Sequence, residues 1–142
     1  MLEPSVSHGG PVQDYVSLID NLRGAGASVE PAGSVSSEFF SVPGEAITVN
    51  GAQVHVFEYA DAAQAKAEAA YISPDGGRIS VPDPSDPSRE REILVEWMGT
   101  PHFYLRERLI VQYIGDDAAV VNVLKAALGP QFAGGAAPLP LK

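Results

Sequence analysis

The residues in this sequence that could carry out chemistry are an adjacent pair of carboxylates and two histidines. Asp116 and Asp117 are neighbours, and His102 stands between a proline and two aromatic residues. A carboxylate pair can act as general acid and base, and a histidine can act as a base when a carboxylate orients it. A small hydrolase or metal-dependent enzyme that uses His102, His55 and a carboxylate is therefore one hypothesis.

The spacing of these residues favours structural roles instead. Adjacent residues at a helix start point in different directions, so Asp116 and Asp117 do not converge, but either can cap free N–H groups. His55 and Glu58 lie three residues apart on a predicted strand, on opposite faces. The chain has no Gly-x-Ser-x-Gly, no His-Glu-x-x-His and no phosphate-binding loop. We therefore assign no catalytic residue, no metal ligand and no cofactor.

Aromatic and imidazole rings at alternate strand positions suggest a binding surface. Such rings more often pack in a core, but exposed rings would form a contact surface for a protein, a peptide or a small molecule. Three of them share one face of the segment QVHVFEY. The candidate binding residues are His55, Phe57, Tyr59, Trp97, His102 and Tyr104.

The composition limits the class of protein. The 142 residues are 45% hydrophobic and 19% charged, which suits one domain with a real core. A net charge of −9 opposes binding to nucleic acid or anionic lipid. The lack of cysteine excludes disulfides and thiolate chemistry. No apolar run approaches the roughly 20 residues of a transmembrane helix, so we expect no transmembrane segment.

Hydrophobic periodicity and capping residues predict three helices. The first spans about 11–23, and the second spans about 61–72 with Asp61 as its cap. The third follows Asp116 or Asp117 and ends at a Gly-Pro pair. The second helix is expected to lie on a sheet with the smooth stripe formed by Ala63, Ala67, Ala70 and Tyr71.

Two hairpins are predicted between these helices. Asn50-Gly51 suits a type I′ turn, and a second hairpin is expected to turn near Arg106-Glu107. A strand is expected over 92–99, and one or two short edge strands are expected, near Val29 and near Phe39. The segment 73–91 is rich in proline and aspartate, which predicts a long loop. The core side of the first hairpin should carry Ile47, Val49, Val54 and Val56.

These elements predict an α+β fold with an antiparallel sheet of four to six strands and helices mainly on one face. The expected order is α-β-β-α-β-β-β-α. A single domain should span 11–132, between a flexible lead at 1–10 and a flexible tail at 133–142. QVHVFEYADAAQAKAEAA and RLIVQYIGDDAAVVNVLKAA both run from strand to Asp cap to helix. Duplication and independent use of the same capping chemistry both explain this similarity.

Several segments resemble a family of small bacterial secreted proteins, which are predicted lipoproteins without an assigned activity. They are FFSVPGEAITVNGAQVHVFEYADAAQAKAEAAYISPDG, Trp97, PHFY, RLIVQYIGDD and LGPQFAG, and the resemblance covers about 12–134. It implies an extracytoplasmic protein tethered by a lipidated cysteine. The chain has no cysteine and so departs from the family at that point. The shared segments are structural in character and transfer no catalytic residue.

The sequence therefore predicts a non-enzymatic binding or interaction module outside the cytoplasm, secreted or lipid-anchored, with a cytoplasmic location left open. A symmetric homodimer through the aromatic face is a variant of this hypothesis. The enzyme that uses His102 and His55 is the first alternative. An inhibitor of a secreted enzyme, with the 73–91 segment as its probe, is the second.

Overall fold

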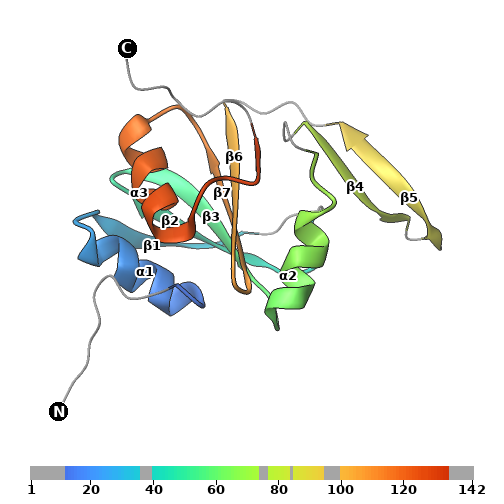
Figure 1. Ribbon diagram of the computed structural model, residues 1–142, viewed down its shortest axis with the longest axis horizontal. Helices are drawn as coiled ribbons and strands as arrows, with labels where there is room; N and C mark the ends of the chain where they lie inside the picture. Colours follow the sequence, from blue (N-terminus) through green and yellow to red (C-terminus); the bar gives the residue numbers. More distant parts are fainter. Residues whose placement is uncertain (1–11, 36–39, 74–76, 84, 95–99, 135–142) are drawn as a thin grey trace.

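The described residues form a six-stranded antiparallel sheet and a separate two-stranded hairpin (Figure 1). The computed structural model describes residues 12–35, 40–73, 77–83, 85–94 and 100–134. The sheet order is β1-β2-β3-β7-β6-β8, and the hairpin is β4-β5. The elements are α1 (Tyr15–Gly24), β1 (Val29–Val35), β2 (Gly44–Val49), β3 (Ala52–Glu58), α2 (Ala62–Ala69), β4 (Arg78–Asp83), β5 (Asp86–Leu94), β6 (Pro101–Arg106), β7 (Leu109–Ile114), α3 (Ala118–Leu128) and β8 (Ala133–Gly134).

The predicted α+β class with an antiparallel sheet is confirmed. The order of elements contains the predicted series and adds β1, β4 and β8 to it. The segment β1 includes the edge strand expected near Val29. Helices α1 and α3 pack on one face of the sheet and α2 on the other. No helix in the described part of the chain is long and apolar enough to cross a membrane.

The two hairpins of the sheet follow from residues that tolerate positive φ. Asn50 (φ 52°) and Gly51 (φ 86°) form the predicted two-residue turn, with Val49 paired to Ala52. The second hairpin turns at Glu107-Arg108, one residue later than predicted, because Arg106 pairs with Leu109. Glu107 has a φ of 51°, a conformation that a residue with a side chain adopts at some cost.

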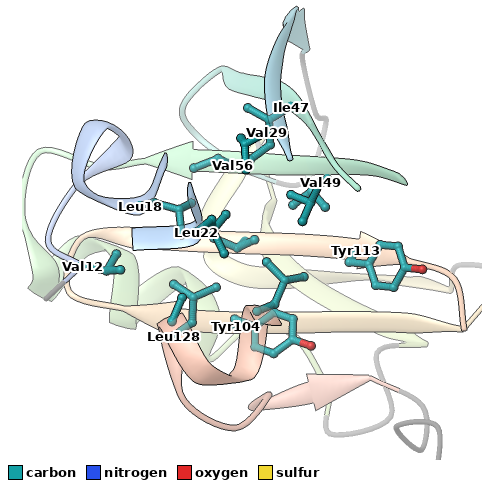
Figure 2. Packing of buried hydrophobic residues seen from close by; sticks show 14 of the residues in the cluster. Val12, Leu18, Leu22, Val29, Ile47, Val49, Val56, Tyr104, Tyr113 and Leu128 are labelled. Atoms are coloured by element: carbon teal, nitrogen blue, oxygen red, sulfur yellow. The ribbon is translucent and has the colours of Figure 1, made fainter. Parts of the chain in front are cut away.

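The first core lies between the sheet and helices α1 and α3. Leu18 and Leu22 of α1 and Leu128 of α3 lie over strand residues that include Val56 and Tyr113 (Figure 2). Its sheet side includes the four apolar residues predicted for the core face of the β2–β3 hairpin, so that prediction is confirmed. These residues are Ile47, Val49, Val54 and Val56.

The second core lies on the opposite face, beneath α2. Asp61 caps α2 as predicted, because its Oδ1 accepts a hydrogen bond of 2.8 Å from the Gln64 N–H. The buried helix positions are Ala65 and Ala69, however, and the predicted stripe of Ala63, Ala67 and Ala70 faces solvent. Five of the eight helix residues are alanine, so hydrophobicity varies little around the helix and could not indicate the buried face.

Helix α1 begins later than the sequence predicts. Asp14 and Ser17 cap it reciprocally, since Asp14 Oδ1 accepts from the Ser17 N–H at 2.9 Å and Ser17 Oγ accepts from the Asp14 N–H at 2.9 Å. Val12 therefore lies before the helix, where it is buried in the first core. Val16, although apolar, is 66% exposed.

The predicted long loop over 73–91 is wrong, because β4 and most of β5 form a hairpin there (Figure 1). We call Arg78–Leu94 the arm. Both of its strands are edge strands, so prolines at 82 and 87 need not interrupt a ladder on both sides. Ile79 is fully buried in the second core, and Ile93 packs against that core at the base of the arm. The Ser80 N–H also donates to the Tyr71 carbonyl oxygen at 2.8 Å.

The predicted flexible tail starts two residues too early. Ala133 and Gly134 pair with Phe103 and His102 and form β8 on the β6 edge of the sheet. Gly134 has a φ of 128° and lies against the Pro101 backbone, so a Cβ at this position would collide with the Pro101 carbonyl group. The predicted lead at 1–10, Phe39, the rest of the tail and Trp97 lie outside the described residues.

Shortening the arm should leave the body intact. In the proposed variant, residues 82–90 are replaced by Asn-Gly, which joins the paired residues Val81 and Arg91 in the manner of the β2–β3 turn. We expect the free energy of unfolding, measured by urea denaturation, to change by less than about 1 kcal/mol, because an isolated two-stranded hairpin is only marginally stable. Ile79→Ala at the buried base should cost about 3 kcal/mol. A larger loss of unfolding free energy in the shortened variant than in Ile79→Ala would show that the outer part of the arm, and not only its base, stabilises the body.

Candidate functional site

His102 of β6 is a structural residue whose ring contacts the turn before α3, the segment after α3 and a tyrosine of β7. Its side chain is fully buried, and its Nε2 lies 2.9 Å from the Gly115 carbonyl oxygen. A carbonyl oxygen only accepts, so Nε2 carries a proton and donates it. Its Nδ1 lies 2.6 Å from Gln131 Oε1, and its ring stacks on Tyr113. The candidate binding role of His102 is wrong, because this ring presents no surface to a ligand.

Asp117 is the N-cap of α3, as the sequence predicts. Its Oδ1 accepts from the Ala119 N–H at 2.9 Å and from the Val120 N–H at 3.4 Å. Its own N–H donates to the Tyr113 hydroxyl at 3.1 Å. Asp116 is exposed. The acidic pair therefore does not converge on a reacting group, and its capping member begins a helix.

His55 and His102 lie on opposite faces of the sheet. His102 is opposite Tyr113, whose side chain is in the first core, while His55 is opposite Gln112 at the next position of β7. His55 lines a hollow of about 140 Å³ with Gln53, Gln112 and Ile114, and its Nε2 lies 3.1 Å from Gln53 Nε2. The structure therefore does not bring together the histidines of the proposed hydrolase.

Phe57 and Tyr59 are buried, at 1% and 2% exposure, so the prediction that they form an exposed binding surface is wrong. Phe57 packs against Phe40 with ring centroids 4.6 Å apart. The Tyr59 hydroxyl donates to Glu68 Oε1 at 2.7 Å. Burial, and then this hydrogen bond and the Glu68 charge, raise the pKa of Tyr59. Helix α2 and the segment before β2 thus cover this part of the face.

Tyr104 is also buried, at 1% exposure, so its candidate binding role is wrong. Its ring lies in the first core with Tyr113 (Figure 2). Within the described residues its hydroxyl has no hydrogen-bond partner. Burial raises the pKa of Tyr104 to about 12, with a smaller contribution from Tyr113.

Arg108 makes ion pairs that fasten the β6–β7 turn to its neighbours. Its Nη2 lies 3.1 Å from Glu58 Oε2 and 3.8 Å from Asp14 Oδ2. Glu58 Oε2 also accepts from the Tyr15 N–H at 3.3 Å. The two hydrogen bonds with Ser17 lower the pKa of Asp14, and Arg108 adds to that effect. These charged side chains connect α1, β3 and the β6–β7 turn, so we assign them a structural role.

Two hollows adjoin this ion-pair cluster. One, of about 310 Å³, is lined by Gln13, Asp14, Ala62, Glu107 and Arg108. The other, of about 410 Å³, lies between Tyr15 and the start of β2. Tyr15 has a raised pKa because of burial and then the nearby Glu45 charge. Across the described residues no three histidine or acidic side chains are grouped to hold a metal ion. The larger hollow is lined by Tyr15, Val42, Pro43, Glu45, Val56 and Glu58.

The arm carries exposed charged groups that the fold leaves unused. Arg78 and Glu92 form an exposed pair at 3.8 Å across its two strands. Arg89 and Arg91 are exposed, and neither has an ion-pair partner in the described part of the chain. Sequence analysis missed this surface because prolines and aspartates suggested a loop. The alternation of REREIL, which favours a strand, was the available signal.

No protein family model, no curated protein and no solved structure matches the chain. The candidate site therefore rests on its own geometry.

The two aspartates before α3 should differ in their effect on stability. We expect Asp117→Ala to lower the free energy of unfolding by about 1 kcal/mol, because the first N–H groups of α3 lose their acceptor. Asp116→Ala should change it by less than about 0.5 kcal/mol. Urea denaturation monitored by circular dichroism measures both. Equal losses would contradict the assignment of Asp117 as the cap.

The buried tyrosines should respond to loss of their hydroxyls with opposite signs. Tyr104→Phe should raise the free energy of unfolding by about 1 kcal/mol, since it removes a buried hydroxyl without a partner. Tyr59→Phe should lower it by about 1.5 kcal/mol, because Glu68 loses a donor. Chemical denaturation at neutral pH measures both changes.

Alkaline pH gives a second measurement on Tyr104. The unfolded side chain ionises near pH 10, whereas the folded one has a pKa of about 12. The neutral form is therefore favoured by folding, and this contribution is complete below pH 10 and is lost as the pH rises towards 12. Wild type should lose stability more steeply than Tyr104→Phe over this range. Parallel slopes would contradict the burial of a neutral hydroxyl.

Proposed function

We propose that this chain is a non-enzymatic binding module that contacts a protein partner through its arm. The observation that carries the proposal is the arm itself, a two-stranded hairpin beside the main sheet (Figure 1). Ile79 and Ile93 pack at its base, and the strands extend beyond them. A hairpin that stabilises the core only at its base is free to present its remaining length to another molecule.

The use of the polar groups elsewhere in the fold supports a binding role. His102 connects β6 to the turn before α3, Asp117 caps α3, and Glu68 receives the Tyr59 hydroxyl. His55 lies on the opposite face from His102. A reaction would need such groups to converge on one substrate, so their dispersal favours binding over catalysis.

We propose an extracytoplasmic location on the resemblance to small bacterial secreted proteins. A two-stranded arm suits contact with a partner's surface, because Arg78 and Glu92 on one of its faces and Arg91 on the other are exposed. The arm replaces the buried rings of β3 as the contact surface in this proposal.

Comparative capture followed by titration tests the proposal. Immobilised full chain and the shortened-arm variant are exposed to the same extracytoplasmic extract, and proteins retained by the full chain alone are purified. Calorimetric titration should then give a Kd for the full chain that is at least about 10-fold lower than for the shortened variant. Unfolding curves show that both baits are folded.

Two outcomes would reject the proposal. One is that every captured protein binds the shortened variant as tightly as the full chain in the titration. The other is that no protein is retained by the full chain alone. A body variant, Glu30→Gln on the exposed surface of β1, is the matched control and should bind like wild type.

A further inference from the structure

The larger hollow, of about 410 Å³, lies where the first core ends, between the start of α1 and the start of β2. We call it the β2 hollow. Val56, which belongs to the first core and is 1% exposed, is paired with Glu45 across the β2–β3 ladder. Glu58 follows Val56 by two residues, so both carboxylates are on the face of the sheet that carries α1 and α3. Helix α1 begins at Tyr15, and the hollow lies at this end of the face.

The lining of the β2 hollow is apolar or aromatic apart from the two carboxylates. Such a lining with a few polar groups, in a volume of roughly 300–1,000 Å³, is typical of a small-molecule site. Burial raises the pKa of Tyr15 and the Glu45 charge raises it further, so the phenol and this carboxylate lie near each other. Arg23 acts on Tyr15 in the opposite direction, but its Nη2 donates to the Val29 carbonyl oxygen at 2.8 Å.

The two carboxylates differ in how their charge is balanced. Glu58 lies 3.1 Å from Arg108 and accepts from the Tyr15 N–H, and both contacts are made by its Oε2. Its Oε1 is a further acceptor. Glu45 has no ion-pair partner among the described residues. The hollow therefore holds one carboxylate with a counter-charge and one without, which favours a ligand that carries a single positive charge.

An alkylammonium ion matches this arrangement. Its –NH₃⁺ group has three N–H donors, and residues at diagonal positions of paired strands, as Glu45 and Glu58 are, lie about 7–8 Å apart, so one ammonium group can reach both carboxylates. A metal ion such as Ca²⁺ matches less well, because it takes about six to eight oxygen ligands. No three histidine or acidic side chains in the described part of the chain are grouped to supply them.

We propose that the β2 hollow binds a small organic monocation, a primary ammonium group on an alkyl chain. The ammonium group donates to the Glu45 carboxylate and to Glu58 Oε1, and the alkyl chain packs against Tyr15 and Val56. The net charge of −9 adds a general attraction for cations. No residue of the arm lines this hollow, so the inference does not rest on the proposed function.

Hexylammonium serves as the probe, and two-dimensional ¹H–¹⁵N NMR measures its binding to the full chain. The probe is added up to ~20 mM, because a ligand of this size binds weakly. We expect saturable shifts at the amides of Tyr15, Glu45 and Glu58. Hexanol, which has the chain without the charge, should bind at least about 10-fold more weakly. Methylammonium, which has the charge without the chain, should also bind at least about 10-fold more weakly.

Two variants with the same change of charge assign the site. Glu45→Gln removes the unbalanced charge and keeps the shape of the side chain. Glu30→Gln removes an exposed carboxylate of β1 that is paired with Thr48, on the opposite face of the sheet. The Kd should rise by about 10-fold or more in Glu45→Gln and by less than about twofold in Glu30→Gln. The shortened-arm variant should bind hexylammonium like wild type, so this test is independent of the proposed function.

Four results would overturn the proposal. They are the absence of saturable shifts, shifts that map away from the hollow, equal weakening in the two glutamine variants, and binding of hexanol as tight as that of hexylammonium. A neutral-backbone peptide with one lysine is titrated in parallel. Tighter binding of this peptide than of hexylammonium, lost in Glu45→Gln, would also overturn the proposal, because it would assign the hollow to a side chain of a partner protein.

Discussion

The antiparallel pairing of β3 with β7 is the interaction on which the rest of the structure depends. The β2–β3 and β6–β7 hairpins form locally, but an isolated two-stranded hairpin is only marginally stable. Pairing of Val54 with Tyr113 and of Val56 with Val111 joins them into one sheet. The Tyr59 N–H extends the ladder to the Arg108 carbonyl oxygen at 2.8 Å, and the Arg108 side chain meets Glu58 at 3.1 Å. The backbone ladder and the Arg108–Glu58 ion pair thus fix one register of β3 against β7.

This register determines where the polar residues can act. The β6–β7 pairing places Tyr113 beside His102, and the Tyr113 hydroxyl accepts from the Asp117 N–H, so the turn into α3 is tied to two strands. The similar strand–Asp–helix units 53–70 and 108–127 meet at the centre of the sheet, yet α2 and α3 cover opposite faces. The Asp caps are thus shared capping chemistry in two different packings, and a common origin is not needed to explain them.

Local features of the fold could be predicted from the sequence, and long-range features could not. The Asn50-Gly51 turn and the caps Asp61 and Asp117 were predicted because each depends on neighbouring residues. Burial of Phe57 and Tyr59 depends on α2 folding back over the sheet and on Phe40, and the alternation of residues along one strand contains neither contact. The arm was missed because its prolines resemble those of a loop.

The open edges of the sheets bear on how a partner can bind. At one edge of the main sheet β1 contains Pro31, which lacks a backbone donor, and its register shifts between Pro31 and Ser34. Gly33 in that shift has a φ of 103°. Such an irregular edge is a poor template for an added strand, and at the other edge β8 covers only His102 and Phe103 of β6. Prolines at 82 and 87 likewise interrupt the backbone donors of the arm. For the proposed partner contact, side chains of the arm are therefore better suited than strand addition, because they keep their donors where the backbone has lost them.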